Sequence, residues 1–140
     1  MTDDVKILAV VNDNWKGIPA CLQRLSRKLK GTIHMIYVED IEPCPAEALI
    51  ELEGKCSEIR EEGMKILKKL EEKAKSLGFN VEILGVHCGI VSERVLKLEK
   101  QLNPDIILVE FKRSFLGRLF STDYVDTLLC KAETPILIVR

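Results

Sequence analysis

Short apolar runs alternate along this chain with longer stretches in which apolar and polar residues are mixed. The runs are rich in β-branched residues and too short for helices, which is typical of strands buried on both faces of a sheet. They cover residues 5–11, 33–38, 81–86, 106–109 and 136–139. We therefore predict five strands.

The mixed stretches place apolar residues three or four positions apart, as on one face of a helix. We expect a first helix that holds Pro19 in its first turn and ends before Gly31, and a long helix from about Leu49 to Leu77. At 1.5 Å per residue the long helix could reach about 45 Å, more than one crossover requires. Its surplus end could therefore project from the body or contact a partner.

Two further helices are expected in the second half of the chain. One begins near Ser92, a residue type that caps helix starts well, and ends before the turn "NPD". The other begins at Ser121, Thr122 or Asp123. The residues it is expected to bury are Val125, Leu128, Leu129 and Ala132.

Strands that alternate with helices in this order predict an open parallel sheet with helices on both faces. The chain has 140 residues, of which 46% are hydrophobic, so we expect one α/β domain over residues 1–140. Its 21 basic and 22 acidic residues give a net charge of -1. We predict neither nucleic acid nor a membrane as partner. The first residues lack a signal-peptide pattern, and we expect a cytoplasmic protein.

The cysteines are odd in number and show no CxxC spacing. They are Cys21, Cys44, Cys56, Cys88 and Cys130. We expect neither a disulfide framework nor a zinc cluster, but small buried apolar residues in a reducing cytosol.

Catalytic chemistry has little support in the sequence. His34 is expected to pack inside the second strand, and Trp15 and Tyr124 are expected to pack as well. His87 and Cys88 could form a thiolate couple, but adjacent strand residues point to opposite faces of a sheet. We predict no catalytic residue and no metal site. The sequence therefore favours a protein that is not an enzyme.

Four segments together resemble the universal stress protein family. They are "VKILAVVND", "GTIHMIYVED", "GIVSERVLKLEKQLNPDIILVE" and "TPILIVR", in the right order and at the right spacing. The resemblance implies a sheet of strand order 3-2-1-4-5. The ligand crevice is then expected at the carboxyl ends of the first and fourth strands, where the strand order reverses. The resemblance also implies a homodimer through the last strand, formed by Ile136, Leu137, Ile138 and Val139.

Members of that family that hold ATP resemble one another in a motif of three glycines, which lets backbone amides approach phosphate. On this chain the first two glycines fall on Glu110 and Arg113, and the third falls on Thr122 or Ser121. The first-strand Asp of those members corresponds to Asn12, which Asp13 follows. The strand lining at Val38 and the third-strand glycine at Gly89 are retained.

The motif therefore resembles that of the glycine-lacking, non-ATP-binding branch of the family. Near a phosphate, Glu110 would add repulsion of about 3 kcal/mol for charges ~5 Å apart at an effective dielectric of about 20. In the same loop, however, Lys112, Arg113 and Arg118 could hold an anion through side chains, with Ser121 and Thr122 beside them.

Two hypotheses follow. The first is a non-catalytic stress-response module that needs no cofactor and acts as a homodimer through an unknown protein partner or a ligand. The alternative is a protein that binds ATP or hydrolyses it slowly, with Lys112, Arg113 and Arg118 in place of the glycine loop.

Overall fold

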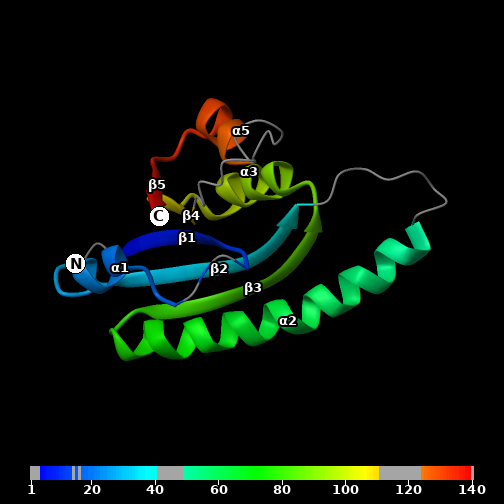
Figure 1. The fold of residues 1–140 in the computed structure, drawn as a ribbon. Helices are drawn as coiled ribbons and strands as arrows, with labels where there is room; N and C mark the ends of the chain where they lie inside the picture. The colour runs from blue at the N-terminus through cyan, green and yellow to red at the C-terminus, as the bar shows by residue number, and fades with distance from the viewer. Residues whose placement is uncertain (1–3, 14, 16, 41–48, 111–123, 140) are drawn as a thin grey trace.

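A computed structural model describes residues 4–13, 15, 17–40, 49–110 and 124–139, with the side chains of residues 40 and 49–55 outside the description. Five strands form one parallel sheet in the order β3-β2-β1-β4-β5, which confirms the predicted order (Figure 1). The strands are β1 (Val5–Val11), β2 (Gly31–Asp40), β3 (Asn80–Gly89), β4 (Ile106–Glu110) and β5 (Ile136–Val139).

Helices cover both faces of the sheet. They are α1 (Ala20–Leu25), α2 (Leu49–Ser76), α3 (Val91–Leu102) and α5 (Tyr124–Lys131). Alternate residues of β1 show the two faces: Ile7 and Ala9 pack with α1 and α2, and Leu8 and Val10 pack with α3 and α5. Because both faces of the central strands are covered, these strands read as continuous apolar runs in the sequence.

The long helix α2 agrees with its predicted bounds. It runs antiparallel to β3, since Gly63 lies beside Val86 whereas Cys56 lies beside Cys88. Its buried residues in the described part are Gly63, Leu67, Leu70 and Ala74. Its amino-terminal end reaches beyond the carboxyl ends of β2 and β3 (Figure 1), as the surplus length predicted.

Three local predictions were wrong. The first helix ends at Leu25, because residues after it form turns in which the Ser26 Oγ donates to the carbonyl of Gln23. Ser92 is not the cap of α3: Ile90, two residues earlier, holds that position, and the helix begins at Val91. Leu129 is 54% exposed, because α5 buries Val125 and Leu128 instead.

β2 and β3 extend further than their apolar runs. Each has ten residues instead of the six predicted, because polar residues at both ends join the ladder of backbone pairs. The register of this ladder shifts between Met35 and Ile36: Met35 pairs with Ile83, and Ile36 pairs with Gly85. Gly85 has a φ of +109°, a conformation that favours glycine.

Candidate functional site

The carboxyl ends of β1 and β4 meet where the strand order reverses. Val10 of β1 pairs with Val109 of β4, so Asn12 and Glu110 follow these partners at the same edge of the sheet. Val38 and Gly89 lie toward the carboxyl ends of β2 and β3. The structure thus places Asn12, Asp13, Val38, Gly89 and Glu110 along one edge, the edge at which open parallel sheets bind ligands.

A side-chain hydrogen bond spans the point of reversal. The Asn12 Nδ2 donates to the Tyr124 Oη over 3.1 Å and links the end of β1 to the first residue of α5. Tyr124 also packs against the apolar cluster beneath α3 and α5. Asn12 therefore has a hydrogen-bond partner within this chain.

The rest of the predicted loop lies outside the described residues. This applies to Lys112, Arg113, Arg118, Ser121 and Thr122. Glu110 is the last residue of β4 and is partly buried.

Negative charge gathers on the α2 side of this edge. Tyr37, near the end of β2, is 4% exposed. Burial raises the pKa of its phenol, and the carboxylates of Asp13, Glu39 and Glu62 raise that pKa further. The three carboxylates come from the end of β1, from β2 and from α2. Their charges disfavour the phenolate form of Tyr37.

Gly89 ends β3 in a conformation that other residues rarely adopt. Its φ is +153°, and a Cβ there would lie 3.2 Å from the His87 Nε2. The same nitrogen lies 3.3 Å from the carbonyl oxygen of Ile90, the N-cap residue of α3. This glycine therefore lets the chain turn from β3 into α3 beside the imidazole of His87.

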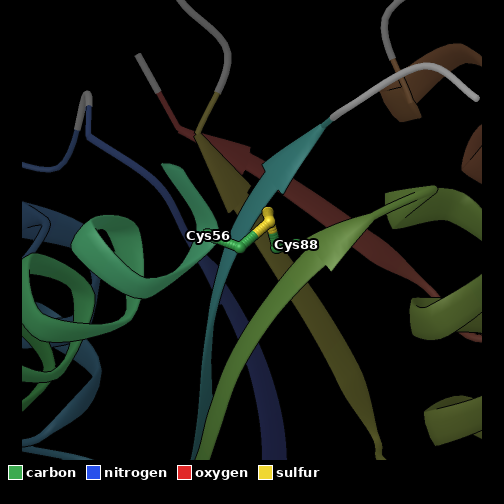
Figure 2. Close-up of a disulfide and its surroundings, with 2 residues drawn as sticks. All are labelled: Cys56 and Cys88. Carbon is green, nitrogen blue, oxygen red and sulfur yellow. A yellow bond between two sulfur atoms is a disulfide. The ribbon is translucent and has the colours of Figure 1, made fainter. Parts of the chain in front are cut away.

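Cys88 points away from His87 and toward α2. Its sulfur is bonded to that of Cys56, with 6.0 Å between the two Cα atoms (Figure 2). The expected divergence of His87 and Cys88 agrees with this arrangement. The expectation that the cysteines are small buried apolar residues was wrong for Cys56 and Cys88, because spacing along the sequence does not show which helix residue lies beside which strand residue.

Of the other described cysteines, Cys130 differs from the expectation of buried apolar residues, whereas Cys21 packs against the apolar cluster beneath α1 and α2. Cys130 is exposed and Cys21 is half-buried. Burial raises the pKa of the Cys21 thiol, which disfavours its thiolate. Neither is bonded to another cysteine.

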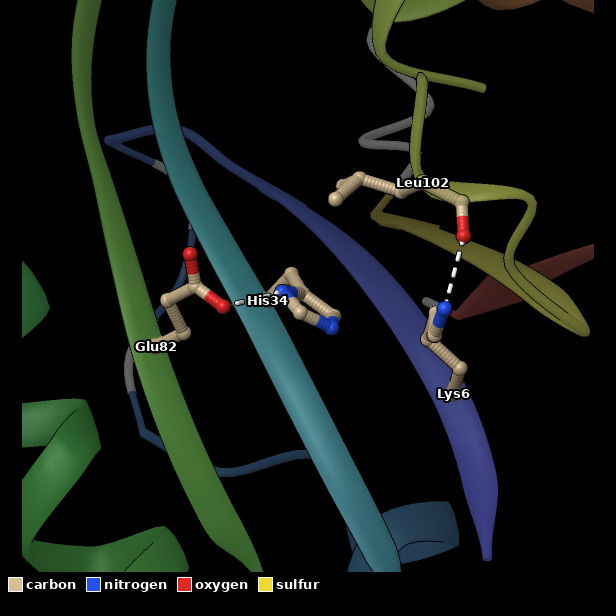
Figure 3. Close-up of polar contacts among 4 residues, drawn as sticks. All are labelled: Lys6, His34, Glu82 and Leu102. Atoms are coloured by element: carbon tan, nitrogen blue, oxygen red, sulfur yellow. Dashed lines mark hydrogen bonds and ion pairs between the residues drawn. The ribbon is translucent and has the colours of Figure 1, made fainter. Parts of the chain in front are cut away.

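Two partly buried polar contacts lie away from this edge, in the half of the sheet that holds the amino ends of the strands (Figure 3). The Lys6 Nζ donates to the carbonyl of Leu102 over 2.8 Å. The His34 Nδ1 lies 3.0 Å from the Glu82 Oε2, at ion-pair distance but without hydrogen-bond geometry. His34 is buried inside β2, as predicted.

Sequence reasoning missed Glu99, which is 9% exposed. Its Oε2 accepts hydrogen bonds from the backbone N–H groups of Glu133 and Thr134, over 3.1 and 2.9 Å. In the sequence it is one glutamate among the charged residues of an amphipathic helix, and no motif marks it. It lines an open cavity of about 680 Å³ between α3 and the segment before β5, which lies away from the edge that holds Asn12 and Glu110.

The outer edge of β5 carries apolar side chains in solvent. Leu137 and Ile138 are 36% and 40% exposed, and Leu129 of the neighbouring α5 is also exposed. Among the strands that the structure describes, β5 pairs with β4 alone. Edges of this kind can pair with a second chain.

In the described ranges no helix is long and apolar enough to cross a membrane. Within those same ranges, no group of three or more His, Cys, Asp or Glu side chains could hold a metal ion.

The sequence model described as "Universal stress protein family" matches residues 20–140. Universal stress protein UspA from Lactobacillus plantarum is 11% identical, with 97% of each chain covered and a TM-score of 0.73. A protein of the family from Arabidopsis thaliana, solved with AMP bound, is 16% identical, with 96% of this chain and 90% of that chain covered and a TM-score of 0.59.

A universal stress protein solved in complex with cAMP is 15% identical, with 98% of this chain and 97% of that chain covered and a TM-score of 0.62. At these identities the likeness to solved structures shows the fold alone. No curated protein matches the chain.

Proposed function

The chain belongs to the universal stress protein family, and we propose that it is a cytoplasmic, non-catalytic stress-response module. It acts as a homodimer, through a protein partner or a ligand, without the family's usual ATP motif. Residues 1–140 form its single domain, which resembles the glycine-lacking branch of the family.

The observation that carries this proposal is the chemistry of the edge where phosphates would approach. Glu110 stands where the first glycine of the ATP motif would be, and Asp13 and Glu39 add negative charge near Tyr37. Asn12, at the position of the nucleotide-binding aspartate, is hydrogen-bonded to Tyr124. A triphosphate would have to approach carboxylates and displace an internal contact.

The first prediction concerns nucleotide. Purified protein should release no nucleotide on acid extraction, and titration calorimetry with Mg-ATP should detect no binding up to millimolar concentration. A nucleotide that copurifies with the chain, or micromolar binding in the titration, would contradict the proposal.

The alternative function is binding or slow hydrolysis of ATP through side chains. It is supported by the cations at Lys112, Arg113 and Arg118, and by the AMP and cAMP bound to two proteins of the same fold. If it holds, Arg113→Ala and Arg118→Ala should each weaken ATP binding, whereas Glu110→Gln should strengthen it by removing repulsion. Equal affinity in all three variants and the unaltered chain would eliminate this mode.

A second prediction concerns the dimer. Ile138→Glu should weaken self-association by about a hundredfold, because a symmetric interface would bury the new carboxylate twice. Sedimentation at several concentrations measures this effect. Ile90→Glu is a matched control, since Ile90 is 38% exposed but lies at the start of α3. A dimer that survives Ile138→Glu and is lost in Ile90→Glu would place the interface elsewhere.

A further inference from the structure

The disulfide between Cys56 and Cys88 links α2 to β3. These two elements follow one another in the chain, and the turn after α2 is their other covalent connection. The sulfurs of the disulfide lie between α2 and the carboxyl end of β3 (Figure 2). The Cα separation of 6.0 Å is within the usual range for disulfides. Both residues are partly buried rather than fully enclosed, so a small thiol can reach the bond.

The helix held by this bond is attached to the sheet unevenly. Its buried described residues, Gly63, Leu67, Leu70 and Ala74, all follow Cys56 by at least seven positions. Between Cys56 and Gly63, only Ile59 packs against the apolar cluster. The other residues of that interval are exposed: Ser57, Glu58, Arg60, Glu61 and Glu62.

This distribution separates two roles along α2. The carboxyl-terminal half is held by the core, and its attachment does not depend on a covalent bond. Between Cys56 and Gly63 the apolar contact with the core comes from Ile59, and the disulfide adds a covalent anchor of this interval to β3. Segments with few buried contacts open locally at low free energy while the rest of a domain stays folded.

The position of the bond connects this local opening to the ligand edge. Cys88 pairs in register with Glu39 of β2 and directly precedes Gly89. Both belong to the carboxyl-terminal edge at which Asn12 and Glu110 also lie. A change at Cys88 therefore occurs at the same edge of the sheet as the candidate crevice, two strands from β1.

We propose that Cys56 and Cys88 form a reversible thiol–disulfide site, which exchanges with low-molecular-weight disulfides such as oxidised glutathione. One cysteine thiolate attacks the glutathione disulfide and releases one glutathione thiolate; the second cysteine thiolate then attacks the mixed disulfide and releases the other. The protein dithiol loses two electrons and two protons, and two molecules of reduced glutathione are formed. In the reduced state, the amino-terminal part of α2 separates from β3 while the fold persists.

The test uses the full chain with Cys21, Cys44 and Cys130 replaced by serine, so that only the proposed pair can react. The protein is equilibrated with mixtures of reduced and oxidised glutathione, and free thiols are counted by the mass added by a maleimide. Hydrogen exchange is then followed by mass spectrometry in both states. We expect the two thiols to disappear together as oxidised glutathione increases, and amides of residues 51–62 to exchange about tenfold faster after reduction.

Two comparisons make the result decisive. Amides of β1 and of residues 64–75 should exchange equally in both states, because the core holds them. The variant with Cys56→Ser and Cys88→Ser should match the reduced chain and ignore glutathione. If this variant fails to fold, the chain that retains both cysteines still provides the reduced state by addition of dithiothreitol.

Several outcomes would overturn the proposal. Faster hydrogen exchange throughout the chain after reduction would mean that the disulfide stabilises the whole fold rather than the amino-terminal part of α2. Equal exchange of residues 51–62 in both states would leave the bond without a local effect. Thiols that stay free at every glutathione ratio, or a disulfide that resists millimolar reduced glutathione, would show that the pair does not exchange.

Discussion

Replacing Gly63 with alanine is expected to lower the free energy of unfolding by about 2 kcal/mol, although alanine is the better helix former. A Cβ at this position would lie 2.6 Å from the Tyr37 Cδ1 and 2.9 Å from the Val86 Cγ2. Neither neighbour can yield easily, because Tyr37 is buried and both belong to paired strands. Urea denaturation at fixed redox state measures the loss.

The control for this prediction is Glu61→Ala, an exposed position on the same helix. It should change stability by no more than about 0.5 kcal/mol. Tyr37→Leu should relieve part of the cost of Gly63→Ala, because leucine has no ring edge facing the helix. The two substitutions should thus couple by about 1 kcal/mol. Costs that simply add would show that the ring of Tyr37 is not what limits the approach of α2.

The close approach at Gly63 matters for the site as well as for stability. It lets α2 lie against the ring of Tyr37 near the carboxyl end of β2, and it brings Glu62 close enough to affect the pKa of Tyr37. About two turns nearer the amino terminus, the helix carries Cys56 and its bond to Cys88. Gly63 therefore sets how closely α2, with Glu62, lies to Tyr37 on the acidic side of the crevice.

The spacing of apolar residues was sufficient to predict the strands and helices, because the signal for each element lies within its own stretch of sequence. β1 was predicted with its observed bounds, since every residue of Val5–Val11 except Lys6 is apolar and the strand is central. The ends of β2 were missed, because Thr32 and Glu39 join the ladder through backbone groups that have no signature in the side chains. Leu129 was misassigned because α5 is short and two residues, Val125 and Leu128, suffice to anchor it.

The candidate site was predictable only where a family position could be transferred. The resemblance placed Asn12 and Glu110 at the carboxyl-terminal edge of the sheet, where the structure has them, but the hydrogen bond from Asn12 to Tyr124 spans 112 positions. The Cys56–Cys88 bond spans 32. Contacts of this kind depend on how a helix is placed over the sheet, which no short sequence window contains.

Glu99 is the strongest case of a residue that only the structure reveals, and its removal should have an effect at least as large as that of Gly63→Ala. Glu99→Ala is expected to cost about 3 kcal/mol, because two hydrogen bonds to a carboxylate are lost together. Glu99→Gln keeps one side-chain oxygen as acceptor and should cost roughly half as much. Lys97→Ala, at an exposed position of the same helix, should be neutral within about 0.5 kcal/mol in the same urea titration.

The location of the loss distinguishes this effect from general destabilisation. Glu99 holds the backbone of Glu133 and Thr134, and the next residue, Pro135, accepts a hydrogen bond from the N–H of Ile107. Relative to the unaltered chain, Glu99→Ala should therefore accelerate hydrogen exchange of the β5 amides more than that of the β2 amides. If β5 is the dimer strand, the variant should also associate more weakly than Lys97→Ala at equal concentration. Exchange that rises equally in β2 and β5 would mean that Glu99 supports the whole core rather than the edge strand.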